Sequence, residues 1–317
     1  MTGNSFTFDL VDMPDFATQE AALNELCPGL TLLGLSPARY KSLFHQPKPK
    51  LLIIRQRDQI ITAAALVLRR EGGQNRLVAT LSALPHPVEP LWTRILELAG
   101  LCKARLITIE MFGPAATNGS PFANEVARHH TQVYVMDLQD ADLEAGLSSN
   151  HRRNLRKAES LGFSMIETTA PEAVAAHVRL CGASNDRRAG RGEKIQGNKD
   201  RKATEAYLET GAARLFQASL RGEVLSSILV LTIGRAAYYD TGGTSPEGMK
   251  MGGSHFLMVH TMVRLKEQGI ATFSLDVANT EGLIKFKTGF GAREWPLQRV
   301  YLEQPSLISR LRRLLGR

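Results

Sequence analysis

The stretch NTEGLIKFKTGFG, residues 279–291, places an aromatic side chain, Phe286, directly beside a lysine, Lys287. A surface helix does not require that order, whereas an active site could use both side chains. When an amine attacks a carbonyl carbon, a tetrahedral oxyanion forms, and a fixed cation in a water-poor cleft stabilises its charge. We therefore predict this role for Lys287; the alternative is a solvated helix lysine like its neighbour Lys285.

Two carboxylates lie where such chemistry would need a proton acceptor. An attacking amine must lose a proton, and Asp240 and Asp276 each lie towards the end of a predicted strand, in AAYYD and FSLDVAN. Tyr238 and Tyr239 could orient a substrate, and strand alternation would put Tyr238 on the same face as Asp240. The alternative is that either aspartate caps or shapes a turn. No Ser/His/Asp order stands out, so we do not expect a covalent acyl-enzyme.

The stretch TGGTSPEGMKMGGSHFLM, residues 241–258, is typical of a strand that enters a glycine-rich loop, which then opens a helix. Glycine lets backbone N–H groups approach a ligand closely, and a helix N-terminus adds unpaired donors and partial positive charge. This order could bind a pyrophosphate or another anion; the alternative is a flexible loop and an ordinary cap. The candidate donor-binding residues in it are Lys250, Gly252, Gly253 and Ser254.

Positive charge gathers in the second half of the chain. Residues 1–145 carry 13 Lys and Arg against 15 Asp and Glu, whereas residues 146–317 carry 26 against 16. A partner that bears phosphate would be attracted there; the alternative is a solvated charge run. No aromatic residues interleave the basic stretches, which weakens an interpretation as an RNA site that stacks bases. The basic side chains at helical spacing are Arg152, Arg153, Arg156 and Lys157, and residues 185–202 add Arg187, Arg188, Arg191, Lys194, Lys199, Arg201 and Lys202.

Hydrophobic periodicity and turn residues predict a mixed α/β protein. In the first half, after an irregular opening, we expect strands over 51–56, 59–70, 75–84, 105–113 and 131–138 and a helix over 90–104. In the second half we expect a strand over 163–169, three antiparallel strands over 213–245, further strands over 271–279 and 294–303, and helices over 148–162, 252–269 and within 279–291, with two more between 170 and 212. The two halves have a similar plan without an obvious sequence repeat.

Composition argues against several classes of protein. Three cysteines, Cys27, Cys102 and Cys181, lie far apart, and the eight histidines show no metal-ligand spacing. We therefore expect reduced thiols and no metal site. The N-terminal stretch lacks the basic and apolar regions of a signal peptide, and no run approaches about 18 apolar residues. These features predict a cytoplasmic protein.

The order of these features resembles the second half of the GNAT acyltransferase fold: a strand meander, a glycine-rich turn, a helix, a strand, and then N-x-x-G-x-x-x-F-K-x-G-F. In that family the turn cradles the pyrophosphate of coenzyme A, the following strand splays from its neighbour, and the acyl arm of the donor lies in the gap. The resemblance makes Asn279 a candidate donor-binding residue. Two departures are that the basic or amide residue leading the turn is missing, unless Lys250 substitutes, and that Phe286 replaces a frequent tyrosine. The positions that match the last motif are Asn279, Gly282, Phe286, Gly289 and Phe290.

LSSNHRRNLRKAESLGF at residues 147–163, followed by FKTGFG at 286–291, resembles the Fem-like branch of that fold. The branch includes peptidyltransferases that use aminoacyl-tRNA and BioF2-type acetyltransferase-domain proteins. The resemblance implies two GNAT-like domains in tandem, with the first degenerate. It also implies that Phe286 and Lys287 contact the donor end, and that an arginine of the second domain's helices holds a phosphorylated acceptor. The candidate acceptor-binding residues are Arg188, Arg191, Arg152, Arg156 and Tyr238.

The predicted fold is therefore α/β, with two tandem GNAT-like domains, each a mixed, mostly antiparallel sheet flanked by helices. We expect a degenerate domain over residues 1–145 and an acyltransferase domain over residues 146–304. The basic amphipathic tail, residues 305–317, could dock on an anionic membrane surface; the alternative is packing against its own domain. Such docking would suit a lipid-linked acceptor at the inner membrane face.

The predicted function is transfer of an acyl or aminoacyl group from an activated donor to an amine by direct attack, without a permanently bound cofactor. The donor stays open between acyl-CoA and aminoacyl-tRNA. The incomplete turn, the pair Phe286-Lys287 and the basic second half favour tRNA, whereas an intact turn would favour coenzyme A. The acceptor amine could be phosphorylated or lipid-linked. The alternative from another class is a non-catalytic GNAT-like module that binds RNA or anionic lipid through its basic second half.

Overall fold

The computed structural model describes residues 6–12, 50–81, 88–113, 122, 124–139, 142–193, 201–209, 211, 213–233 and 235–304. The chain divides into two compact units: unit 1 consists of Met1–Gln132 and Trp295–Arg317, and unit 2 of Val133–Glu294. The last strand of the chain, which the sequence places in the second predicted domain, is thus grouped mainly with unit 1. The tail over residues 305–317 lies outside the described residues.

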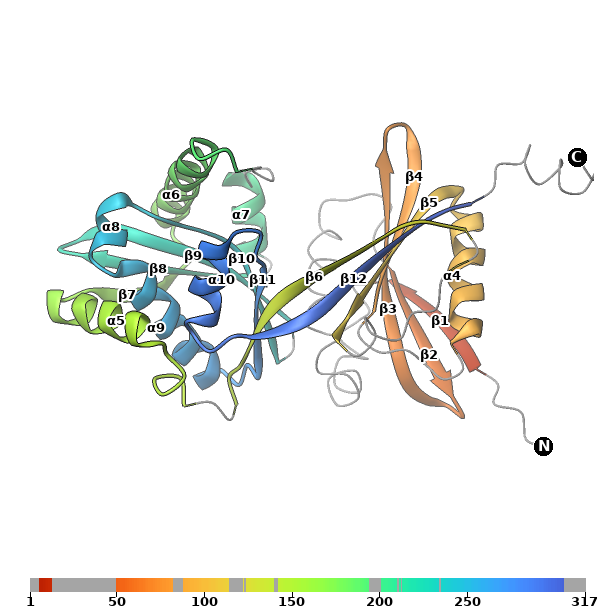
Figure 1. Cartoon of the computed structure of the whole chain (residues 1–317), viewed down its shortest axis with the longest axis horizontal. Coiled ribbons are helices and arrows are strands. Elements are labelled where there is room, and N and C mark those ends of the chain that lie inside the picture. Colours follow the sequence, from red (N-terminus) through yellow and green to blue (C-terminus); the bar gives the residue numbers. More distant parts are fainter. Residues whose placement is uncertain are drawn as a thin grey trace, which may run out of the picture. The chain divides into compact units, whose positions relative to one another are not determined.

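Unit 1 is a sheet with one helix in the described part of the chain. Its elements are β1 (Phe6–Asp12), β2 (Lys50–Gln56), β3 (Gln59–Glu71), β4 (Gln74–Leu81), α4 (Glu89–Leu101), β5 (Ala104–Phe112), the first part of β6 (Glu125–Asp137) and most of β12 (Arg293–Glu303). The strand order is β1-β2-β3-β4-β5-β12 (Figure 1). Neighbouring strands are antiparallel except β4 and β5, which are parallel and joined through α4.

The core of unit 1 lies between α4 and the sheet. Leu91, Ile95 and Leu98 recur at helical spacing and are buried on one side of α4, as the apolar stripe of an amphipathic helix requires. They pack with alternate residues of the strands, such as Ile107 and Ile109 of β5. This arrangement uses the period-two alternation by which a strand turns one set of side chains to the core.

Unit 2 follows the same plan with more helices. Its elements are the second part of β6, α5 (Ser149–Leu161), β7 (Ser164–Thr168), α6 (Pro171–Ala189), α7 (Arg201–Glu209), β8 (Ala213–Leu220), β9 (Glu223–Ile233), β10 (Ala236–Thr244), α8 (Pro246–Lys250), α9 (Gly253–Glu267), β11 (Thr272–Val277) and α10 (Glu281–Thr288). The strand order is β6-β11-β10-β9-β8-β7, and all neighbours are antiparallel except β10 and β11. The parallel pair is joined through α8 and α9, as β4 and β5 are joined through α4.

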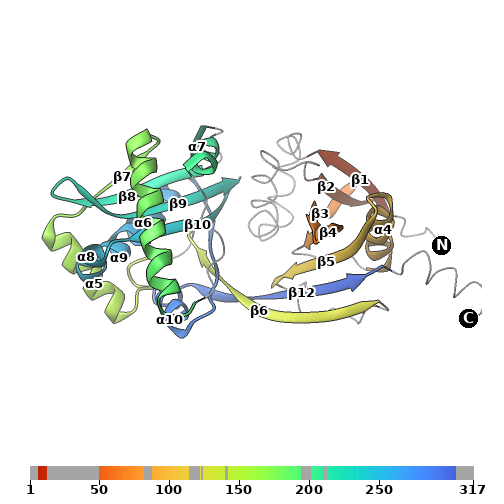
Figure 2. The same ribbon diagram turned by 90° about the horizontal axis from the view of Figure 1, so that it is seen from above.

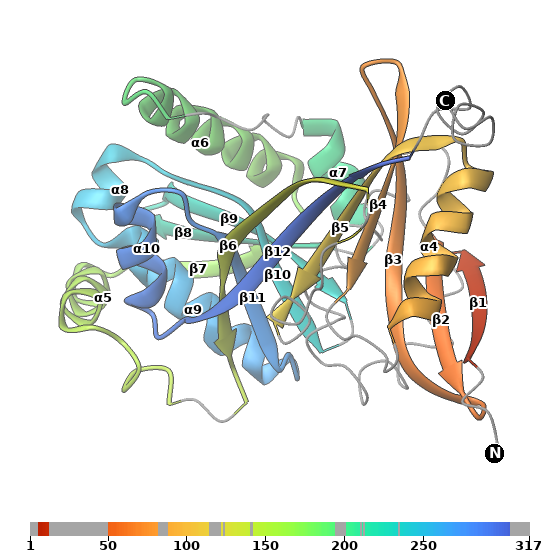
Figure 3. The ribbon, with the colours of Figure 1, turned by 45° about the vertical axis from the view of Figure 1, so that its right-hand side comes forward.

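Helices α6 and α9 cover opposite faces of the unit 2 sheet. Phe216 of β8 belongs to the core with residues of α9, such as Phe256. The next residue, Gln217, points to the other face, where its amide donates to the Ala173 carbonyl of α6. Figure 2 shows α6 lying across β8, β9 and β10, and Figure 3 shows α6 and α9 on the two sides of these strands. Residues of β10 can therefore meet either helix.

Local signals explain where the two helices nearest the site begin. The Ser148 hydroxyl accepts from the His151 N–H and caps α5, which ends at Gly162 in the left-handed conformation (φ 86°). The Thr280 hydroxyl accepts from the Leu283 N–H and caps α10. Both are short side-chain acceptors that satisfy an N–H group left unpaired at a helix start.

The expected elements agree with the structure except at three places. Strand β6 begins at Glu125, six residues before the expected strand over 131–138. The opening of the chain, expected to be irregular, contains strand β1, whose residues pair with β2 from Phe6↔Gln56 to Asp12↔Lys50. The expected glycine-rich loop after residue 241 is mostly regular: β10 continues to Thr244, and α8 follows before the turn at Gly252. β1 forms because it pairs with the distant strand β2. The stretch after Thr244 is helical because the Ser245 hydroxyl caps the start of α8.

No helix in the described part of the chain is long and apolar enough to cross a membrane. Within the same residues, no group of three or more His, Cys, Asp and Glu side chains could hold a metal ion.

Candidate active site

Strands β10 and β11 part in the middle of unit 2. They pair over three register positions, the last of which joins Tyr238 to Ser274. Beyond that point β10 continues along β9, and β11 continues along β6. The register of β10 shifts between Tyr239 and Thr241, and that of β11 shifts between Ser274 and Val277. We call this parting the wedge; bulges on both strands re-aim the side chains beside it.

Unit 1 has the same parallel pair without the parting. There β4 and β5 stay paired over seven positions, from Asn75↔Ala104 to Leu81↔Met111, and keep one register from Arg76↔Leu106 onwards. A pair of strands that stays hydrogen-bonded leaves no room for a substrate between its backbones. The wedge therefore distinguishes the second parallel pair from the first.

Lys287 of α10 reaches the parted end of β11. Its side chain is 9% exposed, and Nζ donates to the carbonyl oxygens of Asp276 at 3.0 Å and Val277 at 2.5 Å. The ammonium also lies 5.7 Å from the centroid of the Tyr134 ring, within the range of a cation–π contact. Burial lowers the pKa of Lys287 to about 8, which the Asp276 charge opposes. Lys287 is therefore a desolvated cation. Lys285 is instead solvated and pairs with Glu281 on the exposed face of α10.

Asp276 contributes through its backbone as well as its charge. Its φ of 63° lies in the left-handed region, which non-glycine residues seldom adopt. Its N–H donates to the Ser274 hydroxyl at 3.2 Å, and its carbonyl accepts from Lys287. The irregular end of β11 is thus the segment that holds the lysine ammonium.

Asp240 occupies the extra position of the β10 bulge. Burial raises the pKa of Cys181 on α6 and of Tyr207 on α7, each to about 12, and the negative charge of Asp240 contributes to both shifts. Burial, Cys181 and Asp240 also raise the pKa of Tyr239. These three neighbours therefore stay protonated near neutral pH.

The bulge overturns the expectation that simple alternation relates Tyr238 to Asp240. Tyr239 packs with the core that includes α9. Thr241 instead reaches α6, because His177 Nε2 lies 3.1 Å from its hydroxyl. An extra residue shifts the alternation, so Tyr238 and Thr241, rather than Tyr238 and Asp240, have equivalent positions.

Two arginines were expected to bind an acceptor, Arg188 on α6 and Arg191 just beyond it. The positive charge of Arg188 contributes to lowering the pKa of both Lys287 and Tyr239. Arg191 is more exposed. Hydrogen bonds from Arg188 and Arg191 hold the pKa of Glu193 below its usual value.

The opposite face of α10 borders an open hollow of about 570 Å³. Phe286 lies there, and its ring centroid is 5.6 Å from that of His151 and 5.5 Å from that of His255. Burial lowers the pKa of His151, and burial with the His151 charge lowers the pKa of His255 to about 4. Both imidazoles are therefore neutral rings near pH 7. The lining residues are Ser148, Asn150, His151, His255, Gly282, Lys285, Phe286, Thr288 and Gly289.

Lys287 is not among the residues that line this hollow. Adjacent helix positions point about 100° apart, so Phe286 and Lys287 serve different sides of α10. On the side of the hollow, His151 Nε2 also donates to the backbone carbonyl of Phe286 at 2.9 Å. The structure thus brings the expected pair to two neighbouring environments, one aromatic and one cationic.

The glycine turn before α9 is covered by its own domain. A Cβ on Gly252 would lie 2.3 Å from the Asn154 carbonyl of α5, and one on Gly253 would lie 3.0 Å from the Phe163 ring. Gly252 has a φ of 81°, and both glycines are buried. These glycines allow α5 to pack closely on the turn.

The other predicted binding residues lie on surfaces around this core. Arg152 donates to the carbonyls of Glu144, Ala145 and Leu147 and so braces the loop before α5. Ser254 contacts His255 Nδ1 at 3.4 Å. The remaining three, all exposed, are Arg156, Lys250 and Asn279.

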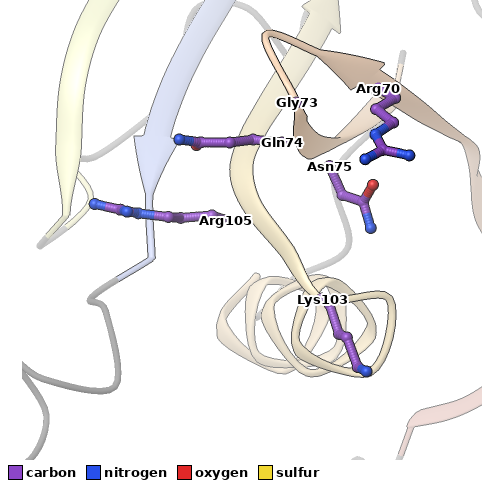
Figure 4. A pocket seen from close by; sticks show the side chains of 6 residues that line it. All are labelled: Arg70, Gly73, Gln74, Asn75, Lys103 and Arg105. Atoms are coloured by element: carbon purple, nitrogen blue, oxygen red, sulfur yellow. The ribbon is translucent and has the colours of Figure 1, made fainter.

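A second hollow, of about 390 Å³, lies in unit 1 at the β3–β4 hairpin and the start of β5. Figure 4 shows that the side chains lining this hollow point in two directions: Gln74 and Arg105 extend to one side, and Arg70, Asn75 and Lys103 to the other. Arg105 also pairs with Glu303 at 2.7 Å. Basic groups therefore occur in unit 1 too, although the sequence places the excess of positive charge in the second half.

The sequence pattern did not single out two buried histidines, His151 and His177. His151 is buried on α5 with Leu155 and Ala158, and its spacing from them is that of an apolar stripe. His177 is buried on α6 beside Cys181, four residues on. The signal that could have found both is an unexpected polar residue on the buried face of an amphipathic helix.

Comparison with protein families matches residues 146–287 to the acetyltransferase (GNAT) domain. The matched segment starts in the loop before α5 and ends at Lys287. A comparison with curated proteins finds no match.

The fold of the whole chain is similar to that of several solved structures. FemX has a TM-score of 0.71 and 15% identity, over 98% of this chain and 100% of FemX. L-PGS from Bacillus licheniformis has a TM-score of 0.56 and 15% identity, over 98% and 99%. A tandem GNAT protein from the clavulanic acid biosynthesis pathway has a TM-score of 0.54 and 14% identity, over 95% and 100%. The predicted α/β fold class is confirmed.

Proposed function

We propose, from the premise that residues 146–287 form a GNAT domain within a Fem-like tandem GNAT fold, that this protein is an N-acyltransferase with its reaction centre at the wedge of unit 2. The observation that carries the proposal is the buried ammonium of Lys287 at the parted end of β11. An ammonium has three N–H donors, and two are used by the carbonyls of Asp276 and Val277. The third would stabilise the oxyanion that forms when an amine attacks the donor carbonyl.

The two aspartates have different roles in this proposal. Asp276 supplies negative charge that favours the protonated form of Lys287. Asp240 accepts the proton that the attacking amine must lose, because its neighbours Cys181, Tyr207 and Tyr239 are all held protonated. The nitrogen–carbon bond forms first and gives the tetrahedral oxyanion. When the oxyanion collapses, the carbon–oxygen bond to tRNA, or the carbon–sulfur bond to coenzyme A, breaks, and the leaving oxygen or sulfur takes up the proton that Asp240 accepted.

Aminoacyl-tRNA is the donor that we favour. A pyrophosphate cradle needs exposed backbone N–H groups at a helix N-terminus, whereas α5 and Phe163 cover Gly252 and Gly253. The neighbouring α5 carries exposed Arg153 and Arg156, which suit an RNA backbone. Acyl-CoA is the second candidate, favoured by the match to an acetyltransferase domain.

The acceptor that we propose is a phosphorylated amine. Arg188 supports it, because this guanidinium lies within electrostatic reach of Lys287 and Tyr239. A phosphate could compete with Glu193 for the arginine, since guanidinium groups bind phosphate in a bidentate manner.

The test is transfer by Lys287→Met, followed as a mass shift on a set of amines with either aminoacyl-tRNA or acyl-CoA. We expect kcat to fall by roughly 10²–10³ with unchanged far-UV circular dichroism. The matched control is Lys266→Met, at an exposed position on α9, which should keep wild-type turnover. Unchanged turnover in Lys287→Met would remove the proposed role. Wild-type protein inactive with both donors across the amines would favour a non-catalytic module that binds RNA or anionic lipid.

A further inference from the structure

A chain of hydrogen bonds runs through the core of unit 2 to Asp240. Gln217 Nε2 lies 3.3 Å from Ser227 Oγ, which lies 2.9 Å from His177 Nδ1. His177 Nε2 lies 3.1 Å from Thr241 Oγ1, and Thr241 Oγ1 lies 3.4 Å from Asp240 Oδ2. The members come from β8, β9, α6 and β10, so only the tertiary structure assembles them.

At one end of the chain, the amide of Gln217 is a donor. Gln217 Nε2 also lies 2.7 Å from the Ala173 carbonyl oxygen, and a carbonyl can only accept, so the atom beside it is the amide nitrogen. An amide nitrogen can only donate. Ser227 Oγ therefore accepts from Gln217, and its own proton can go to His177 Nδ1.

The other end fixes the direction of the chain. An ionised carboxylate can only accept, so Thr241 gives its single hydroxyl proton to Asp240. The Thr241 oxygen must then accept from His177 Nε2–H. The Asp240 end thus requires one tautomer of His177, with the proton on Nε2 and a bare Nδ1, and the Gln217 end is compatible with it.

Three members of this chain of hydrogen bonds lie in the core. Ser227, Gln217 and His177 are 0%, 1% and 2% exposed. Polar groups in a core are costly unless every member is paired, and a fully paired network becomes rigid. The backbones are close as well, because a Cβ on Gly243 of β10 would lie 2.3 Å from the Leu180 carbonyl of α6.

We infer that His177 is a positioning residue: through Thr241, it holds the Asp240 carboxylate in one orientation at the wedge. The inference rests on the proposed role of Asp240 as proton acceptor. A base held in a fixed orientation meets the ammonium proton without a search over rotamers. His177 itself does not touch a substrate in this scheme; it acts through the Thr241 hydroxyl.

The first test needs no substrate. Two-bond ¹⁵N–¹H correlation spectra of the labelled full chain distinguish a protonated from a bare imidazole nitrogen, and the signal missing in His177→Gln assigns this residue. We expect His177 to have a protonated Nε2 and a bare Nδ1. In Thr241→Val, Nε2–H loses its acceptor, so we expect its ¹⁵N shift to move while the other histidines stay. A protonated Nδ1 in the wild type would overturn the inference.

The second test separates positioning from packing. Thr241→Val keeps the shape but removes the hydroxyl, and we expect kcat to fall by about tenfold, the value of one hydrogen bond to a charged group, with unchanged KM for the amine. Thr241→Ser keeps the hydroxyl and should stay within about threefold of the wild type. On α6, His177→Gln retains an N–H donor and should exceed His177→Leu in kcat. Equal kcat in Thr241→Val and Thr241→Ser contradicts the positioning role.

Failure of this inference and failure of the proposed function look different. If Lys287 and the wedge do not catalyse transfer, Lys287→Met keeps its turnover while the His177 tautomer is still as expected. If only the positioning role fails, Lys287→Met loses turnover, whereas Thr241→Val does not.

Discussion

At the scale of single residues, burial gives different chemical properties to two lysines of one helix, Lys285 and Lys287, which are two residues apart. Lys285 is exposed and pairs with Glu281, which contributes little because solvent screens the pair. Lys287 is desolvated, bound by two carbonyls, and has its pKa lowered to about 8. Its protonation state therefore changes within the range in which enzymes are assayed.

The first prediction concerns the pH dependence of turnover. The protonated form of Lys287 is the one that stabilises an oxyanion, so kcat should fall as pH rises through about 8. In Lys287→Arg the cation persists at all assay pH values, and this falling limb should be absent even where the rate is lower. The measurement is kcat from pH 6 to pH 10 at saturating donor. A falling limb near pH 8 that survives in Lys287→Arg assigns the limb to another group.

The second prediction concerns stability. The pKa of Lys287 is about 8 in the folded protein against 10.5 for the unperturbed group, so between these values the unfolded chain binds more protons. Stability due to this residue therefore rises with pH from about 8 to 10.5, by about 3 kcal/mol in total. Urea unfolding of wild type and Lys287→Met at pH 7.5 and 10 should show the wild type gaining relative to the variant. A difference between the two proteins that does not change with pH would contradict the lowered pKa.

At the scale of elements, glycines in the site set how closely helices and strands approach. A Cβ on Gly289 would lie 2.4 Å from the His151 ring, and one on Gly252 would meet the α5 backbone. These positions give α5, α9 and α10 one arrangement, in which His151 donates to the Phe286 carbonyl. The glycine-rich character of the region is thus explained by packing at several positions.

The third prediction compares two glycines beside one helix. Gly289→Ala should lower the free energy of unfolding by about 1–3 kcal/mol, because the added methyl overlaps the His151 ring. Gly282→Ala, within α10 and with nothing within 4 Å of the added Cβ, should raise it by about 0.5–1 kcal/mol through lower entropy of the unfolded chain. Chemical denaturation measures both. Equal effects of the two substitutions would show that the His151 contact does not limit the packing.

At the scale of the whole molecule, the two units share a plan, and only one has the wedge. Each contains a parallel pair joined through helices, but β4 and β5 stay paired over seven positions whereas β10 and β11 part after three. The net charge of the chain is +8, and this charge attracts an anionic donor such as tRNA before any specific contact forms.

The fourth prediction uses that charge. If binding of aminoacyl-tRNA neutralises about three phosphates, KM for this donor should rise roughly 20-fold between about 50 and about 200 mM salt, because condensed counterions are released on binding. The rate at saturation should change little. An aminoacyl ester of a dinucleotide, which has few phosphates, is the matched control. A KM for aminoacyl-tRNA that does not depend on salt would argue against an RNA donor.

The sequence by itself predicted most elements of unit 2 and singled out Phe286 and Lys287 as candidate site residues. Caps such as Ser148 and Thr280, glycines after helices, and apolar periodicity act within a few residues, so they can be recognised without the fold. Strand β1 was not predicted although Phe6, Phe8 and Leu10 alternate, because its pairing partner β2 is distant along the chain, from Asp12↔Lys50 to Phe6↔Gln56.

Only the tertiary structure decided what those residues face. The covering of Gly252 by α5, the separation of Phe286 from Lys287 on two sides of α10, and the chain from Gln217 to Asp240 all join residues that are distant in sequence. Burial and pKa depend on every group packed around a side chain, so a motif can indicate a lysine but cannot set its proton affinity. That affinity follows from the desolvation that packing imposes.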